Sequence, residues 1–207
     1  MNPDQKARMK AFSRYAPYYE MENDESKEAD IIRCWKDSKY RGDHPFVSGK
    51  HLTKNEDPPD FVLKTNEDTV VGVEITELVD QQTVSDWHKG NQCYYMWTSE
   101  EIPKRIEAIL RKKEGKILKK HEGDLSAFDD ILLLIHTDEG TLRFEMIEEA
   151  FKGQNLTSSV FSQVDIIMPP KPRCHGYLEG DPENHPLSDR NVNQLYQLKC
   201  QPVVSRQ

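Results

Sequence analysis

Hydrophobic residues recur along this chain with two spacings, one typical of helices and one typical of strands. In the segment 26–38, Ile32 and Trp35 lie on one face with Ile31 beside them, and Glu28 shares this face by the three-and-four spacing, which predicts a helix. A similar pattern follows the capping-box-like Thr98-Ser99-Glu100-Glu101 and predicts a helix that ends near His121. We expect a third, short helix over residues 141–151.

Short apolar runs bounded by turn residues predict the strands. Phe61–Thr65 and Val70–Thr76 flank a polar turn segment and predict a β-hairpin. Ala127–Thr137 contains five consecutive aliphatic residues, a run typical of a strand buried on both faces. Val164–Met168 predicts a further strand, and Leu195–Cys200 is a candidate for the last one.

The order helix, strand, strand, helix, strand, helix, strand predicts an α/β fold with a mixed central sheet flanked by helices. Residues 39–59 are rich in Gly, Asp, His, Pro and Lys and predict a long loop between the first helix and the hairpin. At 207 residues the chain suits a single domain. We expect residues 1–24 to form an N-terminal arm, and residues 25–207 to form the α/β domain with a loop-rich C-terminal region.

The composition indicates a soluble protein. Charged residues make up 31% of the chain and hydrophobic residues 36%, and the longest apolar runs are much too short to cross a membrane. No apolar segment of the secretory type is visible near the N-terminus. The four cysteines are scattered without a CxxC pair, which favours reduced thiols over a disulfide framework or a zinc site. We therefore expect a cytoplasmic protein with no membrane partner.

The charge distribution changes the expectation about partners. A net charge of −8 argues against nucleic acid, yet residues 104–121 carry eight Lys and Arg residues against two glutamates. Such local segregation either forms a basic surface on an acidic protein or is the solvated face of a helix. If it is a basic surface, we expect it to bind the phosphate backbone of DNA or RNA through Lys104, Arg105, Arg111, Lys112 and Lys116.

Two carboxylates fall inside the hairpin. Asp60 begins the first strand and Glu74 lies within the apolar run of the second. Burying a charge is unfavourable unless it is paired, so the two side chains could converge on one hard cation, Mg²⁺ or Mn²⁺. Alternation along the strand places Glu74 and Thr76 on the same face. The alternatives are that Asp60 is a turn residue, and that Glu74 faces solvent.

Pro59-Asp60 followed by Glu74-Ile75-Thr76, between a helix carrying Glu28 and an amphipathic helix, resembles the PD-(D/E)XK nuclease superfamily over roughly residues 25–138. The resemblance implies a restriction-endonuclease-like core and a metal-dependent nuclease that hydrolyses phosphodiester bonds. It also implies that Asp60, Glu74 and the carbonyl group of Ile75 hold the metal. Glu28 would add a further ligand, or else is an exposed helical glutamate.

The third motif position is Thr76, where the superfamily pattern has lysine. In the superfamily, that lysine is understood to orient the attacking water and to stabilise charge at the phosphate. Thr76 could contact the water without supplying charge. The cation could come from Lys64, which shares a face with Asp60, or from Lys104 or Arg105. Alternatively, the site is slow, or the chain is a catalytically inactive nuclease-fold protein that binds nucleic acid, a protein partner or a second copy of itself.

Overall fold

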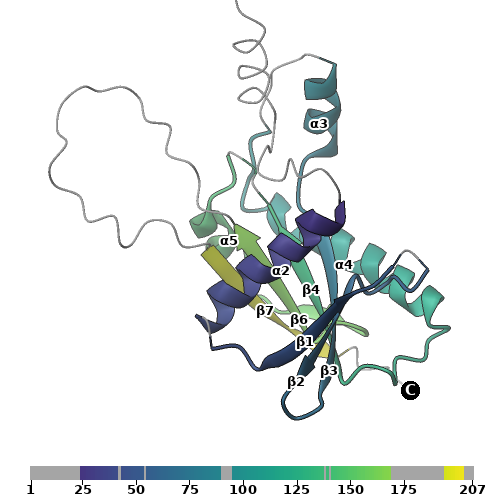
Figure 1. Ribbon diagram of the computed structural model, residues 1–207. Helices are drawn as coiled ribbons and strands as arrows, with labels where there is room; N and C mark the ends of the chain where they lie inside the picture. The colour runs from purple at the N-terminus through teal and green to yellow at the C-terminus, as the bar shows by residue number, and fades with distance from the viewer. Residues whose placement is uncertain are drawn as a thin grey trace, which may run out of the picture.

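The computed structural model describes residues 24–41, 43–53, 55–89, 95–137, 139, 141–168 and 194–202. Its centre is a seven-stranded sheet with the order β1-β2-β3-β4-β6-β7-β5 (Figure 1). The strands are β1 (Phe46–His51), β2 (Phe61–Thr65), β3 (Val70–Glu77), β4 (Asp130–His136), β5 (Leu156–Ser158), β6 (Gln163–Met168) and β7 (Gln194–Pro202). The helices are α2 (Asp24–Tyr40), α3 (Gln81–His88), α4 (Glu101–Lys120) and α5 (Phe144–Ala150).

The sheet is mixed. Strands β1, β2 and β3 form an antiparallel meander. Strand β4 lies parallel to β3, with Glu74 opposite Leu133, and β6 lies parallel to β4. Strand β7 then runs antiparallel to β6 and parallel to the short β5. These pairings confirm the predicted α/β fold with a mixed central sheet flanked by helices.

Strand β4 shows how the sheet separates two hydrophobic layers. Leu133 and its neighbours at alternate positions pack with the buried face of α4 and with α5, whereas Leu132 and Leu134 pack with Trp35 and Ile31 of α2. Because successive side chains of a strand point to opposite faces, a continuous aliphatic run serves both layers. Figure 1 shows α2 crossing one face of the sheet, with α4 on the other side.

The same alternation decides where the polar residues of β3 point. Val73 and Ile75 belong to the hydrophobic layer beneath α2. Glu74 and Thr76 therefore point to the opposite face, toward α4. The described fold thus brings the predicted carboxylate under the basic helix.

The structure corrects one prediction and adds two elements. Strand β1 lies within the segment 39–59 that the sequence predicted as a loop. Its burial explains the error, because Phe46 is buried whereas Val47 to Lys50 are exposed, so this edge strand has no alternating pattern. Helix α3 and strand β5 were not predicted either, whereas the candidate strand Leu195–Cys200 is confirmed within β7.

Other predictions about the chain ends meet the limits of the described residues. The predicted N-terminal arm, apart from the start of α2, and most of the loop-rich C-terminal region lie outside them. Within the described residues, none of the helices combines the length and the apolar character that crossing a membrane requires.

Candidate metal centre and adjoining basic groove

Three carboxylates meet at the entrance to strand β2. Asp57, Asp60 and Glu74 each offer an oxygen, and these three oxygens lie within 4.8 Å of one another. The pair expected from the sequence, Asp60 and Glu74, is therefore brought together. Asp57 comes from the turn before β2 and was not predicted as a site residue.

Backbone contacts fix Asp60 against the end of the hairpin. Its Oδ2 accepts a hydrogen bond from the amide of Ile75 at 2.5 Å, and its carbonyl group accepts one from Leu52 at 2.8 Å. Pro59 packs so closely on β3 that a Cβ atom at Gly72 would lie 3.1 Å from its ring. A glycine at position 72 therefore permits the approach that brings Asp60 to β3.

The end of α4 holds the turn that carries Asp57. His121 Nε2 lies 2.8 Å from the carbonyl oxygen of Pro58, and the Lys120 ammonium group donates to the carbonyl group of Asn55. Both contacts are made with backbone atoms of the segment 55–60. The basic helix thus supports the carboxylate cluster from its C-terminal end.

Glu74 is the most deeply buried of the three carboxylates, with 1% of its surface exposed. Its Oε1 accepts a hydrogen bond from Lys113 Nζ at 2.5 Å, and the same ammonium group donates to the carbonyl oxygen of Ile75 at 2.9 Å. Its Oε2 is buried and has no hydrogen-bond partner among the described residues. A buried carboxylate oxygen without a partner is unfavourable, so a further positive group bound to this oxygen would stabilise it.

The pKa shifts have the same cause. Burial raises the pKa of Asp60 to about 8, and the negative charge of Glu74 adds to the increase. Burial also raises the pKa of Glu74, although Lys113 acts in the opposite direction. The raised pKa values show that the one ammonium group does not balance the negative charge of the cluster when all its carboxylates are ionised. Carboxylate oxygens are hard ligands, so the residues fit a divalent cation such as Mg²⁺ or Mn²⁺.

Lys113 is the cation that stands at this cluster, and the sequence did not identify it. Lys64 forms an ion pair with Asp68 at 2.8 Å in the hairpin turn. Arg105 pairs with Asp80 at 3.0 Å, and Lys104 is exposed on α4. One signal was available, because Lys113 falls on the apolar, inward face of the predicted helix, where a lysine needs a partner.

Glu28 lies outside the three-carboxylate cluster. Its Oε2 lies 2.6 Å from His51 Nε2, and both side chains are about one-quarter exposed. Its charge still contributes to the raised pKa of Asp60, after the larger effects of burial and Glu74. The structure therefore places Glu28 beside the cluster and bonded to β1.

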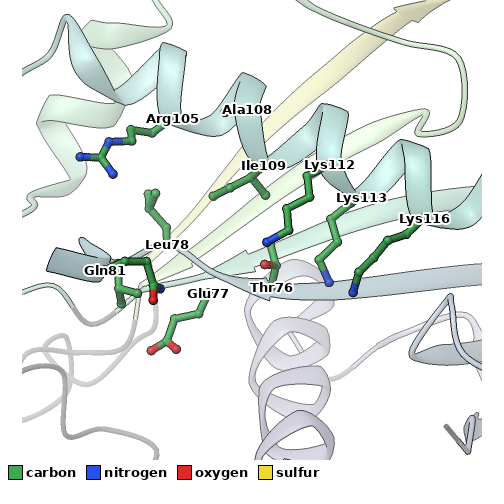
Figure 2. Close-up of a pocket in the computed structure, with 11 residues that line it drawn as sticks. Thr76, Glu77, Leu78, Gln81, Arg105, Ala108, Ile109, Lys112, Lys113 and Lys116 are labelled. Atoms are coloured by element: carbon green, nitrogen blue, oxygen red, sulfur yellow. The ribbon is translucent and has the colours of Figure 1, made fainter. Parts of the chain in front are cut away.

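A groove adjoins the carboxylates, between the end of β3 and α4, with a volume of about 580 Å³. Figure 2 shows lysine side chains of α4 extending toward β3 above Thr76. Glu77 is the acidic residue among the lining side chains, whereas four are basic. The groove is lined by Thr76, Glu77, Leu78, Val79, Gln81, Arg105, Ala108, Ile109, Lys112, Lys113 and Lys116.

Of the five residues expected to bind nucleic acid, three line the groove and two do not. Arg105, Lys112 and Lys116 line it. Arg111 points elsewhere, because its guanidinium group donates to Glu114 at 2.8 Å and to the Thr157 hydroxyl at 3.0 Å. Lys104 is exposed but is not among the residues that line the groove.

Comparisons with known proteins identified no relative of this chain. Function is therefore inferred from the residues of the site and from their order along the fold. A scan against protein-family models, a search of curated proteins and a search of solved structures each found no match.

Proposed function

We propose that this protein is a metal-dependent nuclease with a restriction-endonuclease-like core of the PD-(D/E)XK type. The observation that carries the proposal is the convergence of Asp57, Asp60 and Glu74, with Lys113 bonded to Glu74. The order of α2, the antiparallel β1–β3 meander, α4, and β4 parallel to β3 supports it, because this order extends the resemblance noted in the sequence. The adjoining basic groove suits a polyanionic substrate.

Asp57, Asp60 and Glu74 would hold Mg²⁺ or Mn²⁺, with the Ile75 carbonyl group as a backbone ligand. When bound, such a cation neutralises charge at the phosphate and lowers the pKa of water. Glu28 would act from outside this set through its contact with His51. The unpartnered Oε2 of Glu74 is the observation that most favours an additional cation here.

Lys113 would supply the positive charge that Thr76 lacks. Its ammonium group touches Glu74 and borders the groove, so it can neutralise charge on a phosphate that lies between the two. The Thr76 hydroxyl lines the same groove and can hydrogen-bond a water molecule. Lys112 and Lys116 would bind phosphate groups that flank the reacting one.

The experiment is a cleavage assay on DNA and RNA, single- and double-stranded, with Mg²⁺, Mn²⁺ or EDTA. We expect cleavage with a metal, none with EDTA, and strong loss in the variants Asp60→Asn, Glu74→Gln and Lys113→Met. Lys64→Ala serves as the matched lysine control, because Lys64 pairs with Asp68 instead. Intact substrate under every metal condition, or cleavage that survives both carboxylate changes, contradicts the proposal.

One observation favours a second candidate, a nuclease fold that binds nucleic acid without cleaving it. Lys113 donates to both Glu74 and the Ile75 carbonyl group, which are two of the candidate metal ligands. If this ammonium group replaces the metal, binding would fall steeply with salt but would need no divalent cation. Equal binding by the wild type and Asp60→Asn, with no cleavage by either, would identify this function.

A further inference from the structure

We propose that the groove between β3 and α4 binds one nucleotide of an unpaired nucleic-acid strand. The inference rests on the proposed nuclease function and deepens it, because it names the strand state of the substrate. Lys113 belongs to both places, since it bonds Glu74 and lines the groove. A nucleotide in the groove would therefore lie next to the phosphate held at the carboxylates.

The lysines of the groove are available for a phosphate. Lys112 and Lys116 are exposed, and neither has an ion-pair partner in the part of the chain that the structure describes. Figure 2 shows both side chains extending from α4 on the same side as Lys113. This end of the groove suits the phosphate of a nucleotide.

The middle of the groove is apolar. Its lining includes Leu78, Val79, Ala108 and Ile109. Figure 2 shows Leu78, Ala108 and Ile109 between the lysines and Arg105. A groove that bound inorganic phosphate alone would need no such surface, whereas the sugar and base of a nucleotide can cover it. The volume of about 580 Å³ falls in the range of small-ligand sites, roughly 300–1,000 Å³.

Arg105 bounds the groove at the end away from Lys116, as Figure 2 shows. Its guanidinium group is fixed by Asp80 at 3.0 Å and lies over the rings of Tyr95 and Trp97. Asp80 is itself bonded to the amide and hydroxyl groups of Thr83. One end of the groove is therefore formed by a fixed side chain, and the volume of the groove suits a single nucleotide.

A base can enter such a groove only if it leaves its stack. Bases of a duplex are paired and stacked, and extruding one is unfavourable because its pairing and stacking are lost. Bases of a single strand can be splayed onto a protein surface without that cost. We therefore expect single-stranded oligonucleotides to bind more tightly than duplexes of the same sequence.

The test measures binding of thymidine 5′-monophosphate to the full chain in EDTA, by titration calorimetry or NMR, so that no metal or cleavage contributes. Ala108→Glu places a negative charge in the groove at an exposed helix position, and Ala108→Gln is its neutral control. We expect roughly tenfold weaker binding or more for Ala108→Glu, and nearly unchanged binding for Ala108→Gln. Circular dichroism confirms that both variants fold.

A second pair of variants separates the groove from general basic charge. Lys112→Ala/Lys116→Ala removes two charges inside the groove, and Lys104→Ala/Lys119→Ala removes two exposed charges outside it. We expect the first pair to weaken binding of the mononucleotide by roughly tenfold or more. The second pair should change it by less than about twofold, since screening weakens distant surface charges.

Three results would overturn the inference: equal effects of the two lysine pairs, inorganic phosphate binding as tightly as the nucleotide, or duplex binding as tightly as single strand. The result is also separable from the proposed function. If Ala108→Glu abolishes nucleotide binding but the protein shows no cleavage under any condition, the result supports the nucleotide site in the groove and contradicts the proposed nuclease function. If the protein cleaves nucleic acid but Ala108→Glu does not change nucleotide binding, the result supports the nuclease function and contradicts the nucleotide site in the groove.

Discussion

Two buried glutamates, one on β3 and one on α4, have different surroundings. Glu74 of β3 is 1% exposed and Glu114 of α4 is 5% exposed. Each has a cation from α4 beside it, since Lys113 Nζ lies 2.5 Å from Glu74 and Arg111 lies 2.8 Å from Glu114. Burial and a cationic neighbour are therefore common to both glutamates and do not distinguish them.

The difference lies in the second oxygen. Glu114 Oε1 accepts hydrogen bonds from the Ser158 hydroxyl at 2.6 Å and the Ser159 amide at 2.8 Å. Burial raises the pKa of Glu114, but these bonds and that of Arg111 outweigh it and lower the pKa. Glu74 Oε2 has no such partner among the described residues, and its pKa is raised. Complete hydrogen bonding makes Glu114 structural, whereas Glu74 is left able to bind a cation.

The largest expected effect is on cleavage. Glu74→Gln keeps the shape of the side chain but removes its charge from the carboxylate cluster. We expect the rate of metal-dependent cleavage to fall by about 10³-fold or more, because stabilisation of charge by a metal contributes several kcal/mol. Single-turnover cleavage with saturating Mn²⁺ measures the effect.

Glu114→Gln is the matched control for this variant. Both changes convert a buried glutamate beside α4 to glutamine, and both variants are compared at a temperature at which circular dichroism shows them folded. If the two variants lost cleavage equally, the distinction between the two glutamates would fail.

The next largest effect is the increase in stability that a bound metal ion produces. Mn²⁺ at about 100 times its dissociation constant should stabilise the wild type by about 2.7 kcal/mol, since it binds the folded state. Asp60→Asn should lose this increase, whereas Glu114→Gln should retain it because the three carboxylates lie outside its contacts. Thermal unfolding with Mn²⁺ or EDTA provides the measurement. An increase that persists in Asp60→Asn would place the metal elsewhere.

Because Glu114 has a structural role, we expect its substitution to reduce the stability of the protein and not its metal binding. Glu114→Ala leaves Ser158, the amide of Ser159 and Arg111 without their acceptor. We expect the free energy of unfolding to fall by about 1–3 kcal/mol, as for other buried groups that lose a partner. Urea unfolding in EDTA measures this loss. Glu74→Gln should match or exceed the stability of the wild type there, and a comparable loss in that variant would refute the comparison.

The contrast between strands explains how far the sequence could predict the fold. The aliphatic run of β4 is buried on both faces, so its composition alone marks a strand. Strand β1 carries one buried residue, Phe46, and five positions that contact solvent to some degree, so its sequence resembles a loop. Pairing with β2 defines β1, and that pairing is a tertiary contact that local composition does not encode.

Only part of the candidate site could be predicted from the sequence. Asp60 and Glu74 were expected because each is out of place in an apolar run, and the hairpin register brings them together. The position of the Asp57 side chain depends on the path of the turn through Pro58 and Pro59. The spacing of hydrophobic residues does not predict that path. Lys113 lies 39 residues beyond Glu74 on another element, and the packing of α4 on β3 creates their contact.

The pH dependence of stability should differ in sign between the two regions in EDTA. Burial, and then the negative charge of Glu74, raise the pKa of Asp60 from its usual 3.8 to about 8 in the folded protein. Its contribution to stability is therefore fully present below pH 3.8 and is lost as the pH rises through 8. The lowered pKa of Glu114 has the opposite consequence, since its contribution is present above pH 4.5 and is lost as the pH falls.

Variants isolate the two groups. Between pH 4 and 8, Asp60→Asn should gain stability relative to the wild type, by at most about 1.4 kcal/mol per pH unit. The deficit of Glu114→Gln should instead grow as the pH rises through 4.5 and then stay constant. Urea unfolding across this range in EDTA tests both trends, and parallel curves for the two variants would contradict the assigned shifts.

The smallest expected effect belongs to Lys64, the lysine that the strand pattern favoured as a replacement for the motif lysine. Its ion pair with Asp68 is exposed, with 48% of the Lys64 side chain and 86% of the Asp68 side chain accessible. Exposed pairs contribute little, so Lys64→Ala should leave both the free energy of unfolding and cleavage nearly unchanged. Lys113 is 14% exposed and bonded to Glu74, so Lys113→Met should reduce cleavage strongly. Measured together, these two lysine variants decide which cation serves the carboxylates, because equal losses in both would remove Lys113 from that role.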